Sequence, residues 1–115
     1  MKLVITPSFE RTLDALFARF PRAKACVYAV LEKLSGKYGT EGEIRFTYGL
    51  NLQIRRQSFN LLEDGTFRGG KEYWLYYLVH LARAEIFPFD LHKRKRGDSH
   101  PTHLRAKMNA MLQEI

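Results

Sequence analysis

The stretch Tyr73-Trp74-Leu75-Tyr76-Tyr77-Leu78-Val79-His80-Leu81 is the most aromatic part of the chain. Its continuous apolarity favours a central β-strand covered on both faces, although the same run is compatible with a helix. The next segment, Ala84–Leu91, predicts a partner strand. Pro88 within it predicts a sheet edge or a bulge, because proline cannot donate a hydrogen bond to a β-ladder.

Alternating apolar and polar side chains precede this run. Residues 44–48 and 50–55 both alternate, which predicts half-buried strands with polar and basic side chains on one face. Ser58–Leu62 predicts a further short strand, and Glu63–Thr66 contains an Asp-Gly turn signal. Arg68–Lys71 follows as a basic, glycine-containing loop. The middle and later part of the chain therefore predicts three to five antiparallel strands.

Helical signals occupy the first third of the chain, after a short apolar strand at Lys2–Ile5. Thr6 is a suitable N-cap, and Pro7 suits the first helical position, where its missing N–H would have had no partner. Apolar side chains then recur at helical spacing in two stripes that Pro21 separates. Gly36–Gly42, with three glycines, predicts a loop that connects this helical hairpin to the sheet.

A last helix is expected from about Pro101 to the C-terminus, because apolar side chains share one face there. These side chains are Leu104, Met108, Met111, Leu112 and Ile115. The fold class that follows is α+β: an N-terminal strand and helical hairpin packed on a small antiparallel sheet, with a C-terminal helix. With 45% hydrophobic and 13% aromatic side chains, residues 1–115 are expected to fold as one domain.

The composition excludes several classes of protein. The single cysteine, Cys26, excludes a disulfide framework and a cysteine-rich zinc module, and it is adequately explained as a small buried residue. The hydrophobic content is too high for a disordered chain. No apolar run approaches about 18–20 residues, and no signal-peptide core is present. We therefore expect a soluble, cytoplasmic protein that does not contact a membrane.

Positive charge is concentrated near the C-terminus. The chain has 19 Lys and Arg against 12 Asp and Glu, which is a formal net charge of +7. Between His92 and Lys107, six Lys or Arg stand against Asp98 alone. Such a cluster is an electrostatic footprint for a polyanion, because each neutralised phosphate releases counterions. A solvated basic loop without a partner is the alternative.

Three of the four histidines lie in this basic segment. Cleavage of RNA without a metal needs a base for the 2′-hydroxyl proton, an acid for the leaving 5′-oxygen and cations for the charge on phosphorus. Histidine serves as base or acid near neutrality, and lysine or arginine stabilises the phosphorane. His92, His103 and Lys93 are therefore candidate catalytic residues, and an ordinary polar surface role is the alternative for each histidine.

The candidate RNA-binding residues are side chains of the same segment and basic side chains of the predicted strands. They are Arg94, Lys95, Arg96, His100, Arg105, Lys107, Arg55 and Arg56. Some aromatic side chains of the central run could stack on bases, although most of such a run is core. Glu85 and Asp90 are either general bases or partners that orient an arginine. His80 is expected to be a core histidine.

No cofactor signature appears, and no metal site is expected. A site built from His92, His100 and His103 lacks a carboxylate at ligand spacing, and the surrounding positive charge opposes a divalent cation. The sequence also lacks a phosphate-binding glycine loop, a nucleophile elbow and an H-E-x-x-H motif. Any chemistry therefore depends on the looser group of histidines and cations.

Three segments carry a resemblance to a known family. Residues 2–13 run from an apolar strand through Thr-Pro into a helix, Ile86–Lys93 is a proline-containing strand that ends in a His-Lys pair, and His103–Met108 begins with His and ends in Lys-Met. The first segment and the order of elements resemble the RelE/ParE toxin superfamily of bacterial toxin–antitoxin modules. The other two are similar to YafO-like ribosome-dependent mRNA interferases, whereas residues 39–70 carry no motif of the family.

The resemblance implies a compact α+β toxin that enters the ribosomal A site, cuts mRNA and is held inactive by a small antitoxin protein. It matches His92 and Lys93 to the family's His-Lys pair, and His103 and Lys107 to the helix positions. Two other functions stay open. A ParE-like toxin would inhibit DNA gyrase by binding alone, and a plain RNA- or ribosome-binding module would only recognise phosphates. Neither of these needs acid–base histidines.

Overall fold

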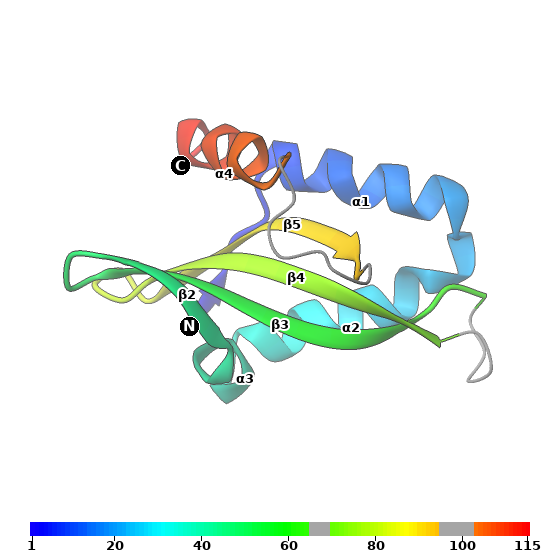
Figure 1. Cartoon of the computed structure of the whole chain (residues 1–115), viewed down its shortest axis with the longest axis horizontal. Coiled ribbons are helices and arrows are strands. Elements are labelled where there is room, and N and C mark those ends of the chain that lie inside the picture. Colours follow the sequence, from blue (N-terminus) through cyan, green and yellow to red (C-terminus); the bar gives the residue numbers. More distant parts are fainter. Residues whose placement is uncertain (65–69, 95–102) are drawn as a thin grey trace.

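A computed structural model of the chain describes residues 1–64, 70–94 and 103–115 (Figure 1). The elements, in chain order, are β1 (Lys2–Leu3), α1 (Pro7–Arg19), a 3₁₀ turn (Pro21–Ala23), α2 (Lys24–Leu34), α3 (Lys37–Glu41), β2 (Glu43–Tyr48), β3 (Leu52–Leu62), β4 (Gly70–His80), β5 (Glu85–Lys93) and α4 (His103–Gln113). The predicted α+β class, with an N-terminal helical hairpin and a C-terminal helix, is confirmed.

The five strands form one sheet in the order β1-β5-β4-β3-β2. Strands β2 to β5 pair antiparallel, as expected. The N-terminal strand β1 was not assigned to the sheet from the sequence. It lies parallel to β5, with Lys2 opposite Glu85 and Leu3 opposite Ile86, so the sheet is mixed. The first and the last strands of the chain are therefore neighbours.

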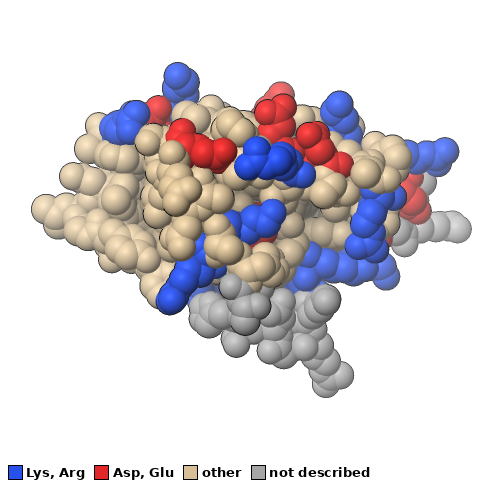
Figure 2. Space-filling view, turned by 90° about the horizontal axis from the view of Figure 1, so that it is seen from above, with Lys and Arg blue, Asp and Glu red and all other residues tan. Residues whose placement is uncertain are grey.

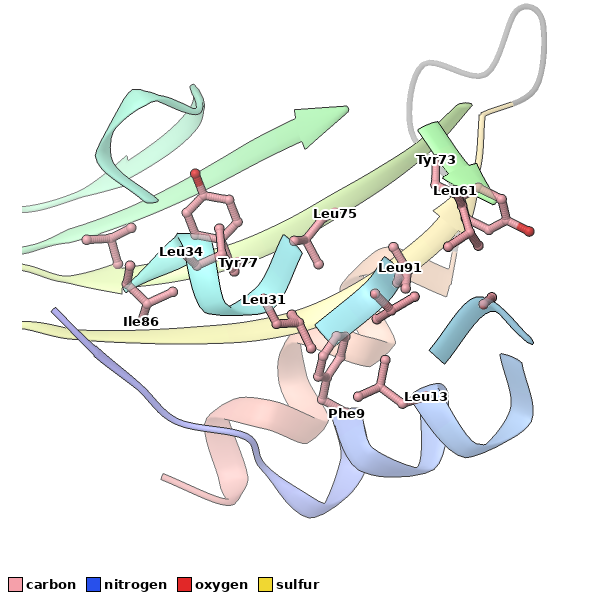
Figure 3. Close-up of a cluster of buried hydrophobic side chains, with 13 residues drawn as sticks. Phe9, Leu13, Leu31, Leu34, Leu61, Tyr73, Leu75, Tyr77, Ile86 and Leu91 are labelled. Carbon is pink, nitrogen blue, oxygen red and sulfur yellow. The ribbon is translucent and has the colours of Figure 1, made fainter. Parts of the chain in front are cut away.

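The central aromatic run is a strand buried on both faces, which confirms the prediction from its apolarity. Tyr77 and Val79 on one face of β4 pack in a core with α1 and α2 (Figure 3). Tyr76 and Leu78 on the other face pack in a second core, in which Met111 of α4 is fully buried. Because side chains alternate along a strand, β4 supplies both cores at once.

The helical hairpin begins as the sequence predicts. The Thr6 hydroxyl oxygen accepts a hydrogen bond from the Phe9 backbone N–H at 3.5 Å, and Pro7 occupies the first helical position. The loop predicted for Gly36–Gly42 is wrong over its middle, where Lys37–Glu41 form the short helix α3. The hydroxyl of Tyr77 on β4 donates to the Gly39 carbonyl at 2.9 Å and holds this turn against the sheet.

The strand prediction is also wrong between residues 50 and 62. Leu50 lies at the tip of the β2–β3 turn and is 91% exposed, and the expected strands 50–55 and Ser58–Leu62 are one continuous strand, β3. The physical reason is pairing. Each β3 residue has a partner on β4, from Leu52 opposite His80 to Leu62 opposite Gly70, so the polar residues between the two predicted strands stay in the ladder.

The bulge predicted from Pro88 is present in β5. Tyr76 of β4 lies opposite Asp90 and Tyr77 lies opposite Pro88, so Phe89 is one extra residue on the β5 side. A bulge of this kind changes the face to which the following side chains point. Phe87, Phe89, Asp90 and His92 therefore face α4, whereas Leu91 packs in the core with α1 and α2.

Gly39 gives a test of how tightly α3 packs. A Cβ atom at Gly39 would lie 2.2 Å from the Leu34 carbonyl oxygen and 2.4 Å from Ile86 Cδ1, whereas at Gly36 the nearest atom is 3.7 Å away. We expect Gly39→Ala to lower the free energy of unfolding by about 1–3 kcal/mol through overpacking. Gly36→Ala should change it by less than about 0.5 kcal/mol. Equal urea denaturation midpoints for the two variants would contradict this packing.

Candidate functional site

Two predicted catalytic histidines meet at one buried carboxylate. His92 Nδ1 lies 2.6 Å from Asp90 Oδ2, and His103 Nε2 lies 3.4 Å from the same oxygen. Asp90 and His92 come from β5 after its bulge, and His103 is the first residue of α4. An ionised carboxylate only accepts hydrogen bonds, so His92 donates its Nδ1–H to Asp90. The adjacent elements β5 and α4 thus bring three polar groups together.

The surroundings of the two imidazoles differ. The His92 ring stacks on Tyr76 of β4, with centroids 5.6 Å apart and an interplanar angle of 18°. The His103 ring meets the His92 ring edge-on at 5.4 Å. The side chain of Asp90 is 2% exposed, that of His92 13% and that of His103 50%. His92 is therefore held by the sheet, and His103 faces solvent above it.

A cleft of about 510 Å³ opens beside this group, between α1, the ends of β4 and β5, and α4. Its polar lining comes from α1, β4, β5 and α4 and from Glu63, which follows β3. This lining consists of Thr12, Arg19, Glu63, Tyr73, Asp90, His92, Lys93, His103 and Lys107. The Lys107 ammonium of α4 donates to Thr12 Oγ1 of α1 at 2.5 Å and joins the two helices across the cleft.

Lys93, the third predicted catalytic residue, lines the same cleft but has an acidic partner. Its Nζ lies 3.4 Å from Glu63 Oε1, and the Tyr73 hydroxyl donates to that oxygen at 2.9 Å. Burial, followed by the Glu63 hydrogen bond, raises the pKa of Tyr73 well above its usual value. Tyr73 therefore stays protonated and acts as a donor at this end of the cleft.

A second group lies on the α4 face of the sheet and is called here the arginine–aromatic cluster: Arg56, Trp74, Tyr76 and Arg94. The guanidinium carbons of Arg56 and Arg94 lie 3.9 Å and 4.9 Å from the centroid of the Trp74 ring. Arg56 also donates to the Tyr76 hydroxyl at 3.3 Å. Because His92 stacks on Tyr76, the arginine–aromatic cluster and the histidine pair form one continuous surface.

Both arginines of this cluster carry acidic partners. Arg56 pairs with Glu43 of β2 at 2.6 Å, and Arg94 pairs with Glu72 of β4 at 2.6 Å. The hydrogen bond from Arg56 lowers the pKa of Glu43, against a smaller opposing effect of burial. These pairs fix the planes of the guanidinium groups against Trp74.

The other predicted RNA-binding residues do not all reach this surface. Arg55 points to the opposite face of the sheet from Arg56, where it donates to the Gly42 carbonyl at 2.6 Å, because neighbouring residues of a strand alternate. Arg105 is exposed on α4, on the opposite flank from His103 and Lys107. Lys95, Arg96 and His100 lie outside the described residues. Figure 2 views the molecule from the side of α1 and α4. Basic side chains prevail along the lower edge of this view, and acidic and basic side chains are mixed along the upper edge.

No carboxylate was expected at ligand spacing from the histidines, and this prediction is wrong. The ligand atoms of Asp90, His92 and His103 all lie within 4.8 Å of one another. The i, i+2 spacing of Asp90 and His92 was the available signal, because it places both side chains on one face of β5, and the bulge at Pro88 turns that face toward α4. No sequence signal placed Thr12 and Arg19 of α1 beside the cleft.

Three comparisons, with protein-family models, with curated proteins and with solved structures, find no match to this chain. Among the described residues, the helices are too short or too polar to cross a bilayer.

The Glu43–Arg56 pair predicts a pH dependence of stability. Since the folded-state pKa of Glu43 is lowered, its contribution is present at neutral pH and is lost as the pH falls below about 4.5. Because the Glu43 side chain is 53% exposed, we expect Glu43→Gln to cost less than about 1 kcal/mol at pH 7 and a smaller amount near pH 3. Urea unfolding at both pH values measures this. Glu41→Gln, which removes an exposed carboxylate with no ion pair to the described residues, is the control, and a Glu43→Gln effect equal at both pH values would contradict the pair.

Proposed function

We propose that this protein is an endoribonuclease that cuts mRNA on the ribosome as the toxin of a toxin–antitoxin module, using His92 and His103 for acid–base catalysis. The observation that carries the proposal is the convergence of both imidazoles on Asp90 at the edge of a basic cleft. The sequence resemblance to YafO-like mRNA interferases supports the choice of mRNA.

The reaction needs two proton transfers around one phosphorus atom. One imidazole takes the proton of the 2′-hydroxyl, whose oxygen then bonds to the neighbouring phosphorus, and the P–O5′ bond breaks. The other imidazole gives a proton to the leaving 5′-oxygen. The products are a 2′,3′-cyclic phosphate and a 5′-hydroxyl. The centroids of the two rings are 5.4 Å apart, which fits two oxygens of one phosphodiester, and the proposal requires RNA binding to expose the buried Nε2 of His92.

Asp90 acts as the positioning residue of the pair. By accepting the Nδ1–H of His92 it sets the tautomer and the direction of the ring, and it stabilises the imidazolium after proton transfer. The Tyr76 ring, which stacks on one face of the His92 ring, restricts the rotation of His92. The general consequence is preorganisation, since the buried carboxylate does not have to move during the reaction.

Cations of the cleft are suited to the charge that develops on phosphorus. Lys107 lies on the same flank of α4 as His103, and Lys93 follows His92 on β5. Both are close to the histidines, but neither forms part of the Asp90 group. Arg94 of the arginine–aromatic cluster, whose side chain is half-exposed, can bind a flanking phosphate.

Two partners follow from the proposal. The substrate is mRNA held on a ribosome, and the cations of the cleft, Arg19, Lys93 and Lys107, suit its phosphates. The second partner is a small antitoxin protein that covers the cleft until the toxin is released. No further cofactor enters the proposed reaction.

We expect His92→Ala and His103→Ala each to reduce cleavage of mRNA by at least about 100-fold, because one proton transfer is lost in each variant. The measurement is mapping of transcript 5′ ends after induction of the protein in growing cells. His80→Gln is the matched control, since His80 lies at the other end of β4 and accepts a hydrogen bond from the Arg83 backbone N–H. Growth arrest should likewise be lost in the two alanine variants and retained in His80→Gln.

His92→Asn, compared by circular dichroism with the unmodified protein, separates loss of chemistry from loss of folding. Full cleavage by both folded alanine variants would overturn the acid–base pair. Growth arrest with DNA damage and intact transcripts would instead show a gyrase inhibitor.

RNA binding can be measured without cleavage, because Trp74 is the only tryptophan of the chain. We expect 2′-O-methyl RNA, which cannot be cut by this route, to change Trp74 fluorescence. Arg94→Ala should weaken binding several-fold and reduce the slope of log affinity against log salt by about 0.7. Arg83→Ala, which removes an arginine at the distant β4–β5 turn, should change neither quantity. Equal effects of the two substitutions would contradict binding at the arginine–aromatic cluster.

A further inference from the structure

We propose that Asp90, His92 and His103 also form a binding site for one divalent transition-metal ion of the zinc type, and that an ion bound there blocks cleavage. The metal site stands on the geometry alone, whereas its inhibitory effect rests on the proposed function. One carboxylate and two imidazoles, all with ligand atoms within 4.8 Å, are the starting observation.

The spacing of the ligand atoms suits a small ion. Zinc binds nitrogen and oxygen at about 2.0–2.1 Å, so neighbouring ligands of a tetrahedral ion are about 3.3 Å apart. Asp90 Oδ2 and His103 Nε2 are 3.4 Å apart. Asp90 Oδ2 and His92 Nδ1 are 2.6 Å apart, a hydrogen-bond distance that has to lengthen to about 3.3 Å when the ion replaces the shared proton. The exposed His103 side chain can turn to complete the set.

The ligand types select among metals. Two imidazoles with one carboxylate favour zinc and similar transition ions, whereas magnesium and calcium prefer oxygen ligands. Three protein ligands leave a fourth position for water on the cleft side. The site is therefore of the open kind, which exchanges its ion with solvent.

The local charges permit a cation. Asp90 is a carboxylate with only 2% exposure, and burial of such a charge is favourable only with partners. Lys93 is paired with Glu63, and Lys107 points to Thr12 of α1. The positive charge that argued against a metal in the sequence is thus partly engaged elsewhere in the described residues.

Occupation of the site is incompatible with the proposed proton transfers. The ion takes the Nε2 lone pair of His103 and replaces the hydrogen bond that orients His92. Both imidazoles remain in place, but neither can exchange a proton with RNA. Zinc would therefore act as an inhibitor of the folded toxin and would not need to unfold it.

The test is titration of Zn²⁺ into the metal-depleted full chain, in competition with a chromophoric chelator and without RNA. We expect one ion per chain, with affinity at least 10-fold lower in His103→Ala and in Asp90→Asn and unchanged in His80→Gln. Circular dichroism of each variant shows whether it is folded, and only folded variants are compared. A tetrahedral absorption spectrum with Co²⁺ in place of Zn²⁺ provides a second measurement, and its loss in His103→Ala supports the site.

Cleavage assays separate the two parts of the proposal. If one equivalent of Zn²⁺ stops cleavage by the unmodified chain and a chelator restores it, the inhibitory effect of the site is supported. Unchanged cleavage with the ion bound overturns that effect. Cleavage that requires Zn²⁺ also overturns it. Affinity that is the same in His103→Ala overturns the metal site, even if the metal-depleted chain cuts RNA. A chain that never cuts RNA, but whose zinc affinity falls in His103→Ala, supports the metal site while the proposed function fails.

Discussion

Burial of β4 on both faces is the constraint around which the other elements are arranged. One face is covered by the helical hairpin, and the other is covered by α4 over Tyr76 and Leu78. Farther along the same face, toward the start of β4, Trp74 is covered by the guanidinium groups of Arg56 and Arg94. The histidine pair lies at the boundary between the apolar cover and the cationic cover. A hydrophobic requirement of one strand thus determines where charged groups can gather.

The sequence predicted the elements whose signals are local. The two-sided strand, the capped first helix and the bulge at Pro88 each depend on residues close together in the chain, and each is confirmed. The predictions that are wrong concern segments whose structure depends on contacts with residues distant in sequence. The short helix α3 requires Tyr77 of β4, and the unbroken length of β3 requires a matching β4. Neither partner is visible in the local pattern.

The candidate site was predicted in part for the same reason. His92, His103 and Lys93 were chosen from composition and spacing, and the structure brings all three to one cleft. Asp90 was predicted to be either a general base or the partner of an arginine, because the sequence alone does not show to which face of the sheet its side chain points. A single inserted residue, Phe89, decides that face. Arg55 and Arg56 are adjacent in sequence, yet only pairing shows which of them lies on the side of the histidines.

The parallel pairing of β1 with β5 has a consequence for the order in which the protein is made. Residues Lys2 and Leu3 leave the ribosome before Glu85 and Ile86 and find their sheet partners only after those residues have emerged. The three groups of the candidate site are later still, since His103 opens the last helix. Domains fold as units during synthesis, and contacts distant in sequence form slowly. For a protein proposed to cut mRNA on ribosomes, this gives a built-in delay: the site stays incomplete until the chain up to His103 has left the ribosome.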